Sequence, residues 1–447
     1  MTVTGAIIGK FLPFHKGHHY LIEQAASQCD ELFVLMTGNY AEEKIVPLAV
    51  RAAWLEELVA SERVHINWRL VDAPIDYYDP TIIGFWAGVI VEMVQEAAAA
   101  LPGVRSVIDK LFTSEADTYG EGTAAAIGAQ HICVDPTRHT FPISGTLARL
   151  DPLAAFAFFD PPVRAYFAKR VRILGGESSG KTSLADALAR RFVTTWVPEW
   201  GRAYSRPKDR RGESWSTADF IAIATRKAEL EDLGARRADR LLICDTEAAN
   251  TGLWHEVYLG RRADEVDAIG AGRKYALTLV TANDFPWVQD GFRTSPQARA
   301  DQQRKVIERL EAQGEAYHLI GGDGADLRAR VAQAAEIITG ATGIAPSDEG
   351  KYWLELGLAG RWHYLRPREN SRRRSLFMAG RDLSACGLID ELLARRLDYE
   401  TLAAELGLPV AAVREADWYS ARHIELAYAE QLGDQENIAS FTDAQCG

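Results

Sequence analysis

The feature that most constrains the fold is a glycine-rich loop at residues 175–182, with the sequence GGESSGKT. It follows an apolar run at 171–174 and precedes a helical pattern at 181–192, which is the strand, loop and helix order that the Walker A pattern requires. In such a loop the backbone N–H groups surround phosphate groups, the lysine reaches the β- and γ-oxygens, and the hydroxyl after it takes a place on Mg²⁺. The sequence therefore predicts a nucleotide-phosphate site at Gly175, Gly176, Glu177, Ser178, Ser179, Gly180, Lys181 and Thr182.

A carboxylate at the end of another apolar run complements this loop. Residues 241–244 read LLIC and are followed directly by Asp245. In P-loop proteins an acid at this place holds the metal ion, directly or through water. Acids at strand ends also act only as caps, and that alternative stays open. We expect ATP and Mg²⁺ at this site, with Thr182 and Asp245 on the metal.

Short apolar runs alternate with helical patterns through the first two thirds of the chain. Fully apolar strands separated by amphipathic helices indicate parallel sheets that are covered on both faces. Two sheets are expected, because a new nucleotide-binding strand begins near residue 170. We therefore predict an α/β protein with an N-terminal Rossmann-like domain at 1–168 and a P-loop domain at 169–342. Past a turn-rich stretch at 340–350, a small, mostly helical domain is expected at 350–447.

Length, charge and cysteine usage limit the class of protein. A chain of 447 residues has room for two or three domains with full-sized cores. Its net charge of -12 argues against bulk affinity for nucleic acid or an anionic membrane. The five scattered cysteines form no CxxC pair, so neither a disulfide framework nor a zinc site is indicated. Without a signal-like start or a membrane-length apolar run, a cytoplasmic protein is expected, and assembly into a homo-oligomer is left open.

A second candidate site begins at an apolar run, 6–8, that leads into GKFLPFHKGH at 9–18. A helix is expected from about residue 19 to 28, so His15 and His18 stand where a helix N-terminus favours anions. The glycine between them lets the main chain approach phosphate closely. Two surface histidines are the alternative. The candidate ligand contacts in this stretch are Lys10, Phe11, His15, Gly17 and His18.

A matching element lies far along the chain at 142–149, PISGTLAR. It has the hydroxyls, glycine and cation of an anion-binding helix start, although an ordinary helix cap is the alternative. Together, FHKGHH and ISGTLAR resemble the HxGH and ISGTxxR signatures of the nucleotidyltransferase superfamily, over residues 5–168. The resemblance implies that the histidines and arginine hold the ATP phosphates while an anionic acceptor attacks the α-phosphorus and expels pyrophosphate. The residues that it adds are Ser144, Gly145, Thr146 and Arg149.

Longer stretches resemble one family, the bifunctional NadR proteins, which join nicotinamide mononucleotide adenylyltransferase to ribosylnicotinamide kinase. They are PLAVRAAWL at 47–55, TSE at 113–115 with YG at 119–120, VDP at 134–136 with Arg138, VPEWGR at 197–202 and DFPWVQDGFR at 284–293. The resemblance implies that Glu199 accepts the proton of a ribose 5′-hydroxyl, and a solvated loop glutamate is the alternative. It also implies a substrate contact at Asp290 and phosphate contacts from Arg293 and Arg299. A plain loop is the alternative explanation of this stretch. A flat pyridinium could stack on Trp54 or Trp86, each of which could instead be core.

The implied activities are consecutive. Phosphorylation of ribosylnicotinamide makes nicotinamide mononucleotide, and adenylylation of that product makes NAD. The main alternative is a phosphopantetheine adenylyltransferase fused to a dephospho-coenzyme A kinase, against which the PEW and PWxxDGxR stretches speak. A regulator that senses ATP and NAD and binds DNA is the alternative from another class.

The C-terminal region is the reason to keep that regulator. Residues 397–416 place Ala403, Gly407 and Val413 at the spacing of a helix-turn-helix, which a helix pair packed on the catalytic domains would fit as well. A basic run lies upstream at Arg361, Arg366, Arg368, Arg372, Arg373 and Arg374. Such a run suits phosphates but is more often a solvated face. In the NadR family a DNA-binding module, where present, is N-terminal, so this region departs from the pattern and nucleic acid is the weaker expectation.

Overall fold

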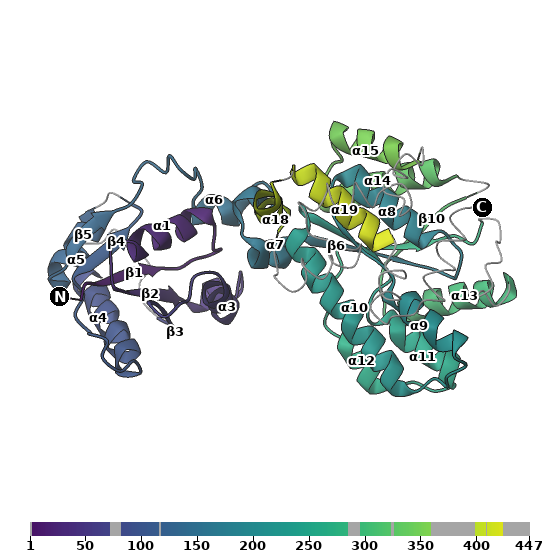
Figure 1. Ribbon diagram of the computed structural model, residues 1–447, viewed down its shortest axis with the longest axis horizontal. Coiled ribbons are helices and arrows are strands. Elements are labelled where there is room, and N and C mark those ends of the chain that lie inside the picture. Colours follow the sequence, from purple (N-terminus) through teal and green to yellow (C-terminus); the bar gives the residue numbers. More distant parts are fainter. Residues whose placement is uncertain are drawn as a thin grey trace. The chain divides into compact units, whose positions relative to one another are not determined.

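The computed structural model describes residues 2–71, 82–115, 118–284, 296–322, 326–358, 398–407 and 409–422. The chain divides into two compact units, residues 1–163 and 164–447. Each unit contains one five-stranded parallel sheet with helices packed against it (Figure 1). The expected fold class, two parallel α/β sheets, is therefore confirmed. In the described part of the chain, no helix combines the length and the apolar character needed to cross a bilayer.

The sheet of the first unit has the order β3-β2-β1-β4-β5. Its strands are β1 (Thr4–Gly9), β2 (Glu31–Gly38), β3 (Val64–Leu70), β4 (Lys110–Thr113) and β5 (Gln130–Cys133). The helices are α1 (Lys16–Ala26), α2 (Tyr40–Glu43), α3 (Leu48–Leu58), α4 (Ile83–Ala99), α5 (Thr118–Ile127) and α6 (Gly145–Leu150). The strand order reverses between β1 and β4, and ligands of open α/β sheets bind at such a switch point.

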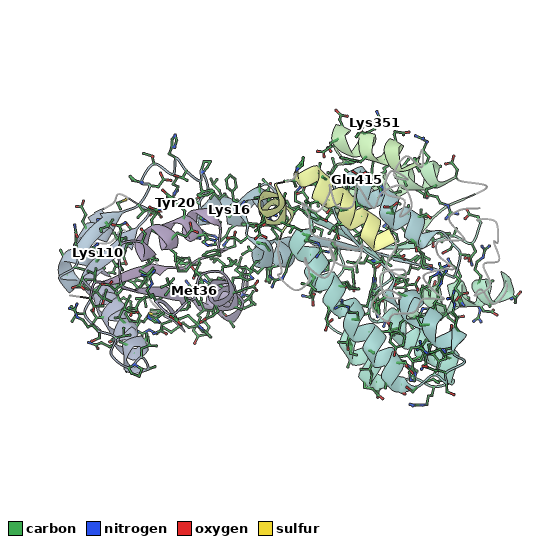
Figure 2. The ribbon with its side chains drawn as sticks, viewed as in Figure 1. Lys16, Tyr20, Met36, Lys110, Lys351 and Glu415 are labelled. Atoms are coloured by element: carbon green, nitrogen blue, oxygen red, sulfur yellow. The ribbon has the colours of Figure 1, made fainter. Side chains whose placement is uncertain are left out.

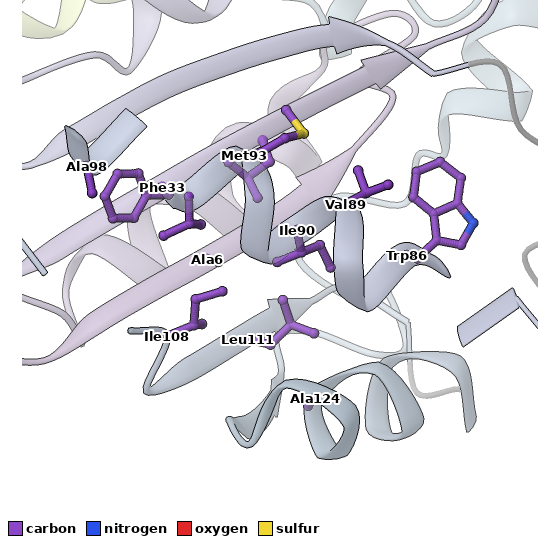
Figure 3. Packing of buried hydrophobic residues seen from close by; sticks show 12 residues of the cluster. Ala6, Phe33, Trp86, Val89, Ile90, Met93, Ala98, Ile108, Leu111 and Ala124 are labelled. Carbon is purple, nitrogen blue, oxygen red and sulfur yellow. The ribbon is translucent and has the colours of Figure 1, made fainter. Parts of the chain in front are cut away.

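The core of this unit lies between α4 and the sheet. Trp86, Ile90 and Met93 come from one face of α4, at the spacing of an amphipathic helix, and lie against β1, β2 and β4 (Figure 3). The opposite side of the sheet is covered by α1, on which Figure 2 labels Lys16 and Tyr20. Burial on both faces explains why β2 is apolar along almost its whole length.

The sheet of the second unit has the order β10-β9-β6-β8-β7. Its strands are β6 (Lys169–Leu174), β7 (Trp196–Val197), β8 (Leu241–Asp245), β9 (Leu277–Thr281) and β10 (His318–Ile320). The helices are α8 (Lys181–Phe192), α9 (Trp200–Arg210), α10 (Thr217–Arg237), α11 (Asn250–Leu259), α12 (Asp264–Gly270), α13 (Pro296–Ala312) and α14 (Leu327–Thr342). In the sequence, the short helices η2 (Phe156–Phe158) and α7 (Pro161–Phe167) follow α6 and precede β6. Strands β8 and β9 are buried throughout. Strands β6 and β8 pair in parallel, so their carboxyl ends place the glycine-rich loop beside Asp245.

The described part of the C-terminal region is helical, as expected. It consists of α15 (Asp348–Leu358), α18 (Tyr399–Leu406) and α19 (Val410–Arg422). Helices α15 and α19 both pack on α8, within the second unit (Figure 1). Helix α19 also packs on α18, so the 397–416 stretch forms a helix pair within the second unit. The basic run at 361–374 lies outside the described residues.

Candidate functional site

The two histidines of the first unit meet at the start of α1. The helix begins at Lys16, three residues before the expected start, because His15 serves as its N-cap in an extended conformation. The Nδ1 atom of His15 accepts a hydrogen bond from the backbone N–H of His18 at 3.3 Å. The two rings are stacked, with centroids 3.6 Å apart. A Cβ at position 17 would lie 3.1 Å from His15 Nδ1, so any larger residue there would press on the His15 ring.

Burial keeps both imidazoles neutral. Desolvation, followed by the nearby charge of Arg138, lowers the pKa of His15 to about 4. Desolvation and then His15 hold the pKa of His18 well below its usual value. Since Nδ1 of a neutral His15 accepts a hydrogen bond, its proton must be on Nε2. Among the described residues this buried Nε2 has no hydrogen-bond partner, and neither has Nδ1 of His18. The site therefore offers a neutral N–H donor suited to a phosphate oxygen.

The ISGTLAR element packs directly on this histidine loop. Ser144 caps α6 by accepting a hydrogen bond from the N–H of Leu147 at 3.2 Å. Arg149 donates to the carbonyl of Leu12 at 2.8 Å and to Oγ1 of Thr146 at 3.1 Å. A Cβ on Gly145 would lie 3.2 Å from the same Leu12 oxygen, which is a tight contact. The fold thus brings together two motifs that the sequence separates by more than 120 residues.

The remaining predicted residues of this unit take several positions. The ammonium of Lys10 forms an ion pair with Glu42 at 2.6 Å. Phe11 is buried with a positive φ of 45°, and its ring meets His18 edge-on at 5.0 Å. Trp54 and Trp86 are only 5% and 3% exposed, and Trp86 belongs to the core cluster in Figure 3. A role of either tryptophan in substrate binding stays a prediction.

Motif reasoning missed two polar residues that support this site. Arg51 is fully buried on α3 and donates to the carbonyls of Lys10 at 2.5 Å and Val46 at 3.1 Å. Asp160 lies 3.1 Å from Nδ1 of His19, and this hydrogen bond raises the pKa of His19. Arg51 is part of the PLAVRAAWL stretch, where an arginine among apolar residues was the available signal.

The glycine-rich loop of the second unit has the expected strand and helix on either side. Gly175 has a φ of 143° and Gly180 a φ of 88°, both in the region that favours glycine, and Ser178 has a φ of 59°. Lys181 is buried, and its Nζ donates to the carbonyl of Gly176 at 2.8 Å. Ser179 donates to the same carbonyl at 2.7 Å. These contacts hold the loop in a compact shape, and phosphate binding by it stays a prediction.

Asp245 lies directly beside the loop. Its Oδ2 accepts a hydrogen bond from Thr182 at 2.5 Å, whereas its buried Oδ1 has no partner among the described residues. Burial raises the pKa of Asp245, and the charge of Glu199 raises it further. A free carboxylate oxygen beside a threonine hydroxyl is a donor set that Mg²⁺ accepts. No cluster of three His, Cys, Asp or Glu side chains with metal-binding geometry occurs in the described segments. The residues therefore fit an ion shared with substrate phosphates, which is how Mg²⁺ is usually bound.

Three further residues shape this site without belonging to any motif. Lys227 of α10, only 2% exposed, donates to the carbonyls of Pro198 at 2.9 Å and Asp245 at 2.7 Å. It therefore ties the end of β8 to the segment that leads to Glu199, the N-cap residue of α9. The available signal was a lysine on the apolar face of an amphipathic helix.

The other two residues are on α13. The side-chain oxygen of Gln303 accepts from the N–H of Gly176 at 2.8 Å, and that of Gln302 accepts from the N–H of Glu177 at 3.0 Å. Nearby, Arg299 donates to the carbonyl of Asn283 at 2.7 Å. Two predicted residues, Asp290 and Arg293, lie outside the described residues.

Comparisons with known proteins assign both halves of the chain. Residues 6–150 match the cytidylyltransferase-like family and residues 170–326 match an AAA domain family. The trifunctional NAD biosynthesis/regulator protein NadR of Escherichia coli (strain K12) is 30% identical over 327 residues, which cover 69% of this chain and 76% of that protein. The phosphopantetheine adenylyltransferase of Shouchella clausii (strain KSM-K16) is 27% identical over 128 residues, 29% of this chain and 72% of that protein.

Two solved structures have a similar fold. The NadR protein in complex with NR has a TM-score of 0.61 at 20% identity, and the NadR protein in complex with NAD and AMP-PNP has a TM-score of 0.59 at 18% identity. Each comparison covers 78% of this chain and 98% of the other. At these identities the likeness concerns the fold alone. The match to the Escherichia coli protein, however, spans both units, and it shows that the chain belongs to the NadR family.

Proposed function

We propose that this chain makes NAD in two ATP-dependent steps. The second unit phosphorylates ribosylnicotinamide to nicotinamide mononucleotide. The first unit then transfers an adenylyl group from ATP to that mononucleotide and releases pyrophosphate. The observation that carries the proposal is a match to a NAD biosynthesis protein that extends across both units.

In the kinase step, the chain positions the reactants and stabilises charge. The loop amides and Lys181 bind the ATP phosphates, and Glu199 accepts the proton of the attacking ribose hydroxyl. Thr182 and Asp245 would hold Mg²⁺, which neutralises charge on the phosphate oxygens when it is bound. Lys227 links the ends of β7 and β8 through its hydrogen bonds to the carbonyls of Pro198 and Asp245. Lid cations at Arg293 and Arg299, and a substrate contact at Asp290, remain part of the proposal.

In the adenylyl step, neutral donors and one cation act together. His15 and His18 donate hydrogen bonds to the triphosphate while the Arg149 guanidinium offsets its negative charge. The phosphate of the mononucleotide attacks the α-phosphorus, and pyrophosphate leaves with the bond electrons. Neutral imidazoles suit this role because they keep their donor geometry at neutral pH.

The test is a substrate comparison with the purified full chain. ATP, Mg²⁺ and ribosylnicotinamide are expected to yield ADP, pyrophosphate and NAD, which chromatography separates. Phosphopantetheine and dephospho-coenzyme A serve as the competing acceptors. If ATP is consumed only with those two, the chain is the coenzyme A fusion and the proposal is wrong.

Two variants separate the steps. Lys181→Ala should lower mononucleotide formation by about 10²-fold or more, yet leave NAD formation from supplied mononucleotide unchanged. His18→Ala should instead let the mononucleotide accumulate. Loss of both activities in either folded variant would contradict two independent sites.

A further inference from the structure

The C-terminal region lies beyond both family matches, the second of which ends at residue 326. Its last described helix, α19, packs on α8 and on β7 of the second unit. Figure 1 shows α15 and α19 near α8, and Figure 2 labels Lys351 and Glu415 on these two helices. The face of α19 that meets the core carries a carboxylate and an indole in succession, Asp417 and Trp418, which are 3% and 0% exposed.

Asp417 connects three elements through one carboxylate oxygen. Its Oδ2 accepts hydrogen bonds from Oγ1 of Thr195 at 2.8 Å and from the hydroxyl of Tyr399 at 2.5 Å. The Nε atom of Arg237, on α10, lies 3.5 Å from the same oxygen. A buried carboxylate is tolerated only when it is paired and hydrogen-bonded, and here it is both. Asp417 therefore ties α19 to α10, to α18 and to the residue that precedes β7.

Trp418 adds a second tie to the same segment. Its Nε1–H donates to the carbonyl of Thr194 at 2.6 Å. The guanidinium of Arg190, in the last turn of α8, lies 5.0 Å from the indole ring centroid. Trp353 of α15 meets the indole edge-on at 5.7 Å. One side chain thus contacts the end of the helix that begins at the P-loop and the start of β7.

Strand β7 needs such support. It has two residues, lies at the edge of the sheet and pairs only with β8 in the described sheet. An edge strand of this length has few ladder hydrogen bonds to hold it in place. Directly after it come Pro198 and Glu199, the candidate general base. Any shift of β7 would therefore move the Glu199 carboxylate relative to the P-loop.

We propose that Asp417 and Trp418 are positioning residues of the kinase, which act by holding residues 194–197 and thereby Glu199. This inference rests on the proposed kinase function of the second unit. It assigns the C-terminal helix pair to the catalytic unit and not to nucleic-acid recognition. A recognition helix must be free to enter a groove and present its side chains to the bases. The described cation of α19, Arg414, is instead directed to Glu349 at 3.7 Å and to the ring of Tyr399 at 5.7 Å.

The test uses conservative variants of the full chain. Trp418→Phe keeps an aromatic ring but removes the indole N–H, and Asp417→Asn keeps the shape but removes the charge. Each should lower the kinase kcat about 10-fold, since small misplacements of reacting groups cost this much or more. The KM for ATP and the adenylyl transfer from supplied mononucleotide should stay within about twofold. Ala411→Ser, on the same helix, is the matched control and should change none of these values.

A third variant tests whether the residues act through β7. Thr195→Val removes the hydroxyl that donates to Asp417, so it should reproduce the loss in kcat. Combined with Asp417→Asn it should add little, because the two changes break the same contact. Circular dichroism establishes that each variant is folded at the assay temperature.

The outcomes separate the two proposals. A wild-type chain without activity on ribosylnicotinamide refutes the proposed kinase function. An active wild type whose folded variants keep full kcat refutes the positioning role. An equal loss in both activities would likewise overturn it, as general destabilisation. Salt-dependent DNA binding by the full chain that Trp418→Phe abolishes, with kinase activity intact, would assign the helix to nucleic acid.

Discussion

Lowering the pH from 7.5 to 5.5 should destabilise the first unit, because His15 is buried in its neutral form. Its pKa is lowered from 6.5 to about 4, mainly by desolvation. A base with a depressed folded pKa binds fewer protons in the folded state than in the unfolded state. Its contribution to stability is therefore complete above the unfolded pKa and is lost as the pH falls toward about 4.

The magnitude follows from these two pKa values. At pH 5.5 most unfolded chains have protonated His15, whereas few folded chains do. The free energy of unfolding should then be about 1 kcal/mol lower than at pH 7.5, and about 3 kcal/mol lower near pH 4. For a unit of this size, 1 kcal/mol corresponds to a fall in Tm of about 2–4 °C. The depressed pKa of His18 acts in the same direction.

Thermal unfolding followed by circular dichroism measures this effect. His15→Asn should reduce the shift in Tm between the two pH values, whatever it does to Tm at pH 7.5. His139→Asn, which removes an exposed imidazole from the same unit, is the control and should leave the shift unchanged. If His15→Asn and the wild type lose equal stability between pH 7.5 and 5.5, the reasoning from neutral burial is refuted.

Three further predictions concern the second unit. Lys227→Met should lower the free energy of unfolding by about 2–4 kcal/mol and the kinase kcat at least 10-fold, because buried carbonyls lose their donor. Denaturant titration and kinetics measure these two quantities, and unchanged values would contradict the linking role of Lys227. Gln303→Ala should lower kcat/KM for ATP about 3- to 10-fold in the kinase reaction alone, since the Gly176 N–H loses its acceptor. An equal loss in adenylyl transfer would argue against a role of Gln303 that is confined to the kinase site. Burial raises the pKa of the Cys244 thiol, so a thiol reagent should modify the half-buried Cys133 first and Cys244 only after denaturation, as peptide mass mapping would show.

Much of the fold could be predicted from local patterns. Apolar runs between amphipathic helices predicted both parallel sheets, and the strand, loop and helix order at 171–192 predicted the P-loop. Element limits were less accurate. Helix α1 begins earlier than expected because His15 caps it. The limits of three separate domains remain predictions.

Part of each site could not be predicted because its contacts join residues far apart in the chain. Lys227 has no motif, and it matters because α10 brings it to the ends of two strands. Asp417 reads as one acid in a helical stretch, yet it lies 2.8 Å from Thr195, more than 200 residues earlier. A single sequence contains no local pattern for such contacts.

Local sequence patterns were enough to mark the two candidate phosphate sites. Glycines that adopt positive φ, a lysine and a threonine mark the candidate phosphate loop, and the paired histidine and ISGTLAR elements mark the second candidate site. The protonation and contacts of these groups depend instead on how the chain packs. Three features depend on burial by segments remote in the sequence: the neutral form of His15, the inward position of Trp418, and the Asp245 oxygen that has no partner in the described part of the chain. Loss of water contact changes the free energy of charged and polar groups, and that loss arises only when the chain packs.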